Sequence, residues 1–323
     1  NYWNDFAVLR PALNVLSRIP NVFDANIDED IWSLMIKITR NVIQNELLML
    51  SCVKVLSHIV SAIPKSHLSV MTENTRATTN LVINALRNHL DPDLQEYGIS
   101  VLNIIAIRQE MDIMWRYIRY LIDAGGVHST VAAIILLENR PSAKRLGLNL
   151  LTICMVDETC FDDIPVPVAL DCMRQNPNDS LMQINGLTIL LRLINMTAKR
   201  QKFIRLNGIS VLYHAMAPNN DPNYDPNDER RVELAVKCFK MYMVLSQDDE
   251  RTKFGSEQLK HSAGYFLGLF PDRLIAVYQK YTNNTEIMVG LIVCFFMAFR
   301  ALVDGDAATS LIGKLDAKIV VSI

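Results

Sequence analysis

The segment GLNLL, residues 147–151, has a pattern that recurs along the whole chain: a small residue followed by apolar residues one, three and four positions later. This spacing places the apolar side chains on one face of an α-helix, and the small residue lets a neighbouring helix approach closely. Each copy therefore predicts a buried helix. The other copies are CVKVL at Cys52, GISVL at Gly98, GLTIL at Gly186, AVKCF at Ala235 and GLIVC at Gly290.

Helical periodicity extends beyond these copies. Apolar residues recur at helical spacing nearly everywhere, and strand-like alternation is scarce, which predicts an all-α chain. Most copies follow a polar turn and another apolar segment, such as VAAIILLENRPS at 131–142. The copies lie about 40 to 55 residues apart, close to the length of armadillo and HEAT repeats. The repeating unit is therefore predicted to be a helical hairpin.

In two of the predicted hairpins, the second helix has a recognisable start signal. Asp93 lies three residues before Glu96, and Ser180 lies three residues before Gln183, which is the spacing of a capping box. The side-chain oxygen of the first residue would accept a hydrogen bond from a backbone N–H of the first turn. We therefore expect Asp93 and Ser180 to cap helices.

Two segments carry a more specific resemblance. IDAGGVHSTVAAIILL (122–137) and FIRLNGISVLYHAM (203–216) each contain a short helix, a Gly turn and an apolar helix. In this the chain resembles the armadillo-repeat family, over about residues 27–303. The resemblance implies one domain over residues 1–323, a right-handed superhelical solenoid of about six armadillo/HEAT-like repeats. It also implies a concave groove that binds other proteins without catalysis.

The groove of the nuclear-import adaptors in that family carries a Trp two positions after the small residue and an Asn six positions after it. In none of its six copies does this chain have the Trp or the Asn at these positions, so binding of nuclear-import signals is not carried over. At the first position it has Lys54, Ser100, Asn149, Thr188, Lys237 and Ile292. At the second position it has His58, Ile104, Ile153, Arg192, Met241 and Phe296.

Polar residues at these positions interrupt otherwise apolar helices, which indicates an exposed line facing the groove. We expect this line to contact an acidic or polar segment of a partner protein, although an ordinary solvated face accounts for the same pattern. We define it as the groove seam: Lys54, His58, Ser100, Asn149, Thr188, Arg192, Lys237 and Met241.

A second candidate lies in RQEMDIMWRYIRYLIDAGG, residues 108–126. Its aromatic and basic side chains are within helical reach of one another, and we define four of them as the aromatic/basic patch: Trp115, Arg116, Arg119 and Tyr120. Peptide recognition through cation–π contacts is one interpretation. The other is that Trp115 packs in the core and leaves the arginines in water.

The segment APNNDPNYDPNDERR, residues 217–231, resembles a calcium loop because Asp and Asn alternate in it. However, Pro226 stands where the sharp turn needs Gly, and Val232 stands where the bidentate Glu belongs. We therefore interpret residues 218–229 as a loop insertion between helices and predict no metal site.

Composition excludes several classes of protein. A net charge of −2 and a pI near 6.3 argue against nucleic-acid binding, which needs a clustered basic surface. The six cysteines are scattered without metal-ligand spacing, which predicts buried, reduced thiols and a cytoplasmic location. The longest apolar run, 287–299, is shorter than the ~18 residues of a membrane span.

No hydrolase, nucleotide-binding or metalloenzyme motif occurs in the sequence, and the six histidines lie far apart. We therefore expect no catalysis and no cofactor. The sequence predicts a scaffold or adaptor module, a fragment of a longer protein, that binds another protein. The alternative is an autoinhibitory solenoid that regulates a catalytic domain outside this sequence.

The segment EIMVGLIVCFFMAFRALV, residues 286–303, is apolar almost all round. The last repeat of a solenoid needs a polar outer face. We therefore expect Phe295, Phe296 and Phe299 to pack against residues beyond this sequence or against a second copy, which predicts self-association through the C-terminal repeat.

Overall fold

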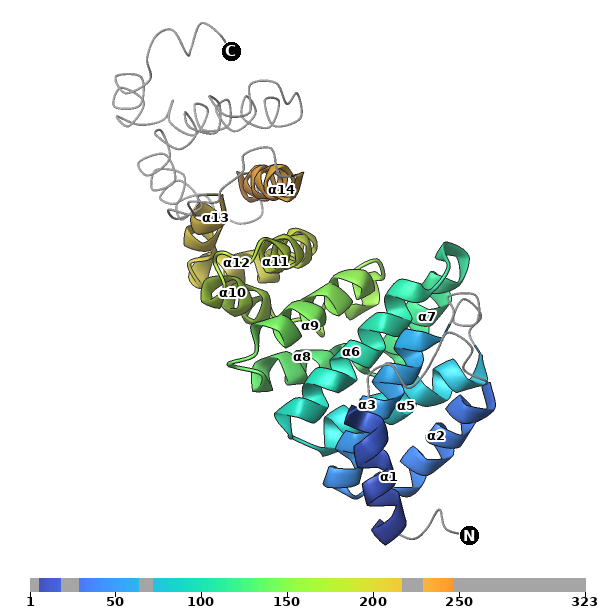
Figure 1. Cartoon of the computed structure of the whole chain (residues 1–323). Helices are drawn as coiled ribbons and strands as arrows, with labels where there is room; N and C mark the ends of the chain where they lie inside the picture. Colours follow the sequence, from blue (N-terminus) through green and yellow to red (C-terminus); the bar gives the residue numbers. More distant parts are fainter. Residues whose placement is uncertain (1–5, 19–28, 64–71, 217–228, 247–323) are drawn as a thin grey trace, which may run out of the picture. The chain divides into compact units, whose positions relative to one another are not determined.

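The computed structural model describes residues 6–18, 29–63, 72–216 and 229–246 (Figure 1). Within these ranges every regular element is a helix and there is no strand, so the prediction of an all-α fold is confirmed. The residues form two compact units, of which the first ends at Val168 and the second begins at Ala169. A single continuous solenoid of about six repeats stays a prediction.

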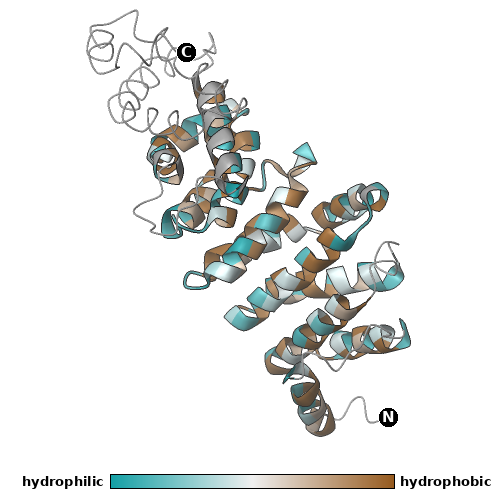
Figure 2. Ribbon diagram, turned by 45° about the horizontal axis from the view of Figure 1, so that its top comes forward, coloured by the Kyte–Doolittle hydropathy of each residue, from teal (hydrophilic) through white to brown (hydrophobic). Residues whose placement is uncertain are grey.

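The first described helix of the first unit lies outside all six sequence copies. Hydrophobic and hydrophilic stretches alternate along its helices, as amphipathic packing requires (Figure 2). The elements are α1 (Phe6–Arg18), α2 (Glu29–Asn41), α3 (Glu46–Ala62), α5 (Glu73–Asn88), α6 (Pro92–Arg108), α7 (Met111–Asp123), α8 (Gly126–Leu136), α9 (Pro141–Cys154) and the short 3-10 helix η2 (Glu158–Cys160).

These helices pack in two layers. In one layer α1 packs on α3, α3 on α6, and α6 on α9 (Figure 1). In the other layer α2 packs on α5, and α5 on α8. The layers meet in the pairs α2/α3, α5/α6 and α8/α9, so the described part of this unit contains three helical hairpins, as the sequence predicts.

Glycines allow two of these hairpins to close. A Cβ atom added at Gly98 would lie 2.6 Å from Cδ2 of Leu86, and one added at Gly147 would lie 2.6 Å from Cγ1 of Ile134. Real Cβ atoms do not approach neighbours so closely, so a larger residue would force the Leu86 or Ile134 side chain, or the helix that carries it, to shift. The predicted role of the small residue is confirmed at both positions.

Helices begin at both predicted places, but the predicted capping residues are wrong. The N-cap of α6 is Asp91, whose carboxylate accepts a hydrogen bond from the backbone N–H of Leu94 at 2.9 Å. Pro92 follows as the first helical residue, where its missing N–H costs nothing. In the second unit, the helix predicted to start with Ser180 is capped by Asp179, one residue earlier. Each of these aspartates precedes the predicted cap and displaces it.

A buried glutamine follows each of these N-caps and forms hydrogen bonds with the end of the preceding helix. Gln95 Nε2 donates to the carbonyl oxygens of Leu86 and His89, at 2.8 and 2.5 Å. Gln183 makes the same pair of bonds to two carbonyl oxygens at the preceding helix end, at 2.8 and 2.9 Å. Both glutamines stand four residues after the N-cap and three before the helix glycine. Each satisfies carbonyl groups that a helix end leaves without partners.

The second unit contains the end of the described chain. In it α11 and α13 both pack on α14, and α12 packs on α13. Gly186 lies against Met173 of the preceding helix, as the equivalent glycines of the first unit lie against theirs. The elements are α10 (Val166–Gln175), which begins at the boundary, α11 (Ser180–Leu193), α12 (Thr197–Arg205), α13 (Gly208–Met216) and α14 (Glu229–Ser246).

The two segments with the armadillo resemblance share one turn geometry. Gly125 before α8 has φ +80°, and Asn207 before α13 has φ +54°, both in the left-handed region. Side-chain atoms of Leu121 and Phe203 fill the space that a Cβ would need at Gly126 and Gly208. The short helix therefore turns tightly into the next one at both places.

Two predictions fall on residues outside the described ranges. Residues 217–228, nearly all of the loop insertion, lie outside them, and Glu229 is the first residue of α14. Phe295, Phe296 and Phe299, with the rest of the C-terminal repeat, also lie outside them.

Candidate functional site

Four groove-seam residues belong to the first unit, and three neighbouring helices of one layer carry them. Lys54 and His58 are the two residues between 51 and 60 on α3 that are not buried. Ser100 on α6 and Asn149 on α9 are also partly exposed, and each has a buried residue on either side. Equivalent positions of three stacked helices therefore present polar side chains to solvent.

Hydrogen bonds connect this face from helix to helix. Asn149 Nδ2 donates to Oδ1 of Asn103 on α6 at 2.8 Å. On the opposite side of α3, His58 Nε2 lies 3.3 Å from the carbonyl oxygen of Ser17 at the end of α1. Both contacts are partly buried, so they hold neighbouring helices in register while leaving the seam accessible.

Ion pairs run along the same face. Lys54 Nζ lies 3.8 Å from Asp93 Oδ2 at the start of α6. Arg140, the residue before α9, places Nη1 2.6 Å from Asp93 Oδ1 and 2.7 Å from Glu96 Oε2. Hydrogen bonds to Glu96 and then to Asp93 raise the pKa of Arg140. The three helices α3, α6 and α9 are thus linked by one chain of alternating charges.

The second unit carries the other half of the groove seam. Thr188 is partly exposed and donates to the Ile184 carbonyl at 2.8 Å, while Arg192 is exposed. Lys237 on α14 is partly exposed and lies 3.3 Å from Glu233. These side chains can reach solvent, as the sequence predicts.

The structure corrects the prediction for Met241. It is fully buried, so the prediction that it contacts a partner is wrong. On α14 it continues the buried stripe formed by Leu234, Cys238 and Leu245, whose spacing places all four side chains on one helical face. Position six after the small residue therefore lies on the buried side of α14.

The aromatic/basic patch lies on α7. Trp115 is 53 % exposed, and Arg116 and Arg119 are exposed. The aromatic residue that packs in the core is Tyr117, whose hydroxyl lies 3.3 Å from Thr79 Oγ1 and whose burial raises its pKa. The interpretation that places Trp115 in the core is therefore wrong.

Half of this patch is engaged within the protein. Arg119 Nη1 lies 2.5 Å from Asp157 Oδ2. The pKa of Asp157 is lowered, first by hydrogen bonds from Thr159 and then by Arg119. Tyr120 donates to the Arg76 carbonyl at 3.2 Å, and its ring lies 5.8 Å from the Arg76 guanidinium. Trp115 and Arg116 are exposed and make no such contact with the residues that the structure describes.

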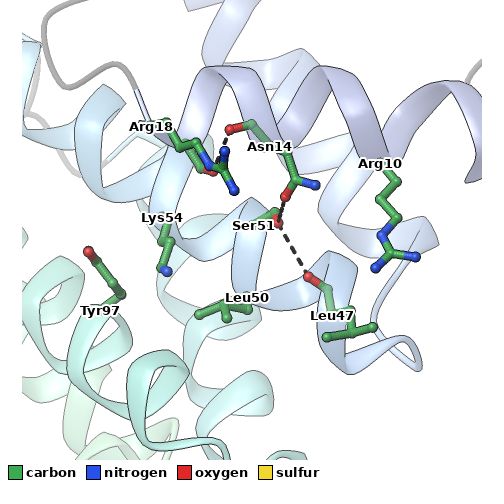
Figure 3. Close-up of a pocket in the computed structure, with 9 residues that line it drawn as sticks. Arg10, Asn14, Arg18, Leu47, Leu50, Ser51, Lys54 and Tyr97 are labelled. Atoms are coloured by element: carbon green, nitrogen blue, oxygen red, sulfur yellow. Dashed lines mark hydrogen bonds between the residues drawn. The ribbon is translucent and has the colours of Figure 1, made fainter.

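A pocket of about 370 Å³ adjoins the groove seam between α1, α3 and the start of α6 (Figure 3). Arg10 and Arg18 line it from α1, and Lys54 lines it from α3. Hydroxyl and amide groups complete its polar lining, and we call it the basic pocket. The further polar residues are Asn14, Ser17, Ser51 and Tyr97.

Charge in the basic pocket is one-sided. Among the residues that the structure describes, no acidic side chain lines it. Lys54 has Asp93 at 3.8 Å, whereas Arg10 and Arg18 form no ion pair with the residues that the structure describes. Such an arrangement attracts anions, because no described acidic side chain compensates the charge of either guanidinium group.

Sequence reasoning missed Arg10 and Arg18, because the armadillo resemblance begins near Ile27 and leaves α1 out. A signal was present: Arg10, Asn14 and Arg18 are four residues apart, which places them on one face of a helix. That Lys54 faces the same space follows only from the packing of α1 on α3.

No protein-family model and no curated protein sequence matches this chain. Across the described ranges, no three or more His, Cys, Asp and Glu side chains are grouped so that they could hold a metal ion. None of the helices described is both long and apolar enough to cross a membrane. Cys52, Cys154, Cys160, Cys172 and Cys238 are buried thiols.

Proposed function

We propose that this chain is a non-catalytic protein-interaction module that binds an extended segment of a partner protein along the groove seam. The observation that carries this proposal is the recurrence of Lys54, Ser100 and Asn149. Each stands two residues after the small residue of its helix, each is partly exposed, and each has buried neighbours.

Spacing in the first unit favours an armadillo-like repeat as the basis of this surface. Three hydrogen bonds join residues that are 46 positions apart: Trp32 to Thr78, His89 to the Ile43 carbonyl, and Asn149 to Asn103. The same displacement along the chain thus carries each of these helices onto the next helix of its own layer. A solenoid is the arrangement in which each unit contacts its neighbours in this way.

The seam has a spacing that an extended peptide could follow. Packed helices lie about 8–10 Å apart. An extended chain advances about 3.3 Å per residue. A partner running across α3, α6 and α9 would therefore meet one seam position about every three residues. Hydrogen-bonding groups at these positions suit a polar or acidic partner segment.

Site-specific photo-crosslinking tests the proposal. A benzophenone amino acid replaces Ser100 or Asn149 in the whole chain, and Lys37 serves as the matched control because it is exposed on α2 in the other layer. We expect one and the same partner protein to be cross-linked from Ser100 and Asn149, and not from Lys37. Equal cross-linking from all three positions, or none from the two seam positions, would show that the seam is not the binding surface.

A further inference from the structure

We propose that the basic pocket binds the phosphoryl group of a phosphorylated side chain in the partner segment. The inference rests on the proposed function, because Lys54 belongs both to the groove seam and to the pocket. A segment lying along the seam would therefore pass the mouth of the pocket. The pocket adds to the seam a selective site for one modified residue.

The charges of the pocket match a doubly charged anion. Arg10 and Arg18 form no ion pair with the described residues, while the charge of Lys54 is shared with Asp93. The balance is thus about two uncompensated positive charges. A phosphorylated side chain carries about −1.5 to −2 at neutral pH, whereas a carboxylate carries at most one negative charge. Charge balance therefore favours the phosphoryl group.

Hydrogen-bonding geometry favours the same ligand. A guanidinium group presents a planar fork of donors that matches two phosphate oxygens. Figure 3 shows Arg18 and Lys54 toward one end of the pocket with Tyr97, and Arg10 toward the other end. A tetrahedral phosphoryl group between them presents three terminal oxygens, one more than a planar carboxylate, and so offers more acceptors to donors at both ends.

The neutral lining is fixed by its own contacts. Ser51 Oγ donates to Asn14 Oδ1 at 3.3 Å, which leaves the Asn14 amide nitrogen as a donor for a ligand. Lys54 Nζ is held 4.9 Å from the centre of the Tyr97 ring. The volume of about 370 Å³ is at the lower end of ligand sites and leaves room for a phosphorylated side chain.

Peptide libraries test the proposal with the 323-residue chain. One library has phosphoserine fixed at its centre, and two matched libraries have serine or glutamate there. We expect the immobilised chain to retain the phosphoserine library and to release the other two. We also expect that an oligouridylate does not displace it, although that polymer carries phosphates as well.

Paired substitutions connect retention to the pocket. Arg10→Gln with Arg18→Gln should weaken phosphoserine binding about tenfold or more, because it removes two charge-assisted donors. Lys37→Gln with Arg40→Gln changes the net charge equally on exposed positions of α2 that do not line the pocket, and should leave binding unchanged. Arg10→Lys with Arg18→Lys keeps the charge but loses the fork, and should also weaken binding.

Several results would overturn the proposal. Equal retention of the phosphoserine and glutamate libraries would show a general acidic site, and displacement by the oligouridylate would show a nucleic-acid site. Undiminished binding by the folded Arg10→Gln, Arg18→Gln variant would place the phosphoryl group elsewhere. If the three libraries behave alike while Ser100 and Asn149 still cross-link a partner, the pocket proposal is wrong and the proposed function stands. Loss of those cross-links would count against the proposed function itself.

Discussion

Asn149 on α9 donates a hydrogen bond from Nδ2 to Oδ1 of Asn103 on α6, across 2.8 Å. Asn103 is buried, whereas Asn149 is partly exposed on the groove seam. One residue of the candidate binding surface therefore also satisfies a buried polar group of the next helix. Binding and stability are coupled at this position.

Asn149→Ala should destabilise the chain by about 1–3 kcal/mol, because it leaves a buried amide oxygen of Asn103 without its donor. Ser100→Ala is the matched control at the equivalent position of α6, and should change stability by less than about 0.5 kcal/mol. Denaturant unfolding of both variants measures the difference. Similar midpoints for the two would show that the amide pair contributes nothing.

Gln95→Leu and Gln183→Leu should each destabilise the chain by about 1–3 kcal/mol, since each removes a donor shared by two carbonyl groups at a helix end. The apolar replacement keeps most of the volume, so a cavity does not confound the result. Hydrogen exchange should show increased opening of the preceding turn. Protection that is unchanged there would refute the role assigned to these glutamines.

Trp115→Ala and Tyr117→Ala should differ greatly in their effect on the free energy of unfolding. Trp115 is half exposed, so its loss should cost less than about 1 kcal/mol, whereas loss of the fully buried Tyr117 should cost about 3–5 kcal/mol. Thermal unfolding monitored by circular dichroism compares them. The reverse order would restore the interpretation in which Trp115 belongs to the core.

Asp157→Asn should reduce stability at neutral pH and much less in acid. The pKa of Asp157 is lowered in the folded state, so the carboxylate stabilises the fold above the ordinary pKa of about 3.9. That stabilisation is lost as the pH falls through the folded-state pKa. The melting temperatures of the two proteins should therefore converge below about pH 4. A gap that stays constant from pH 7 into acid would exclude this linkage.

Local periodicity and residue size were sufficient for much of the fold. Helices follow from the 3.6-residue recurrence of apolar side chains, and the close approach at Gly98 and Gly147 follows from the absence of a Cβ. The exposure of Lys54, Ser100 and Asn149 follows as well, since a polar residue between apolar neighbours marks the open side of a helix. These properties depend on residues within one or two helical turns.

Tertiary structure decided the properties that depend on contacts between helices distant in sequence. Met241 is buried and Trp115 is exposed because packing determines which face of α14 and of α7 is covered. The sequence pattern alone does not determine this face, because apolar residues occur on more than one side of each helix. The basic pocket exists because α1 packs on α3 and brings Arg10 and Arg18 to Lys54. The sequence by itself determined an all-helical chain with polar residues at recurring positions. Only the packing of helices distant in sequence determined which charged side chains share one space, because contacts across helices have no local period.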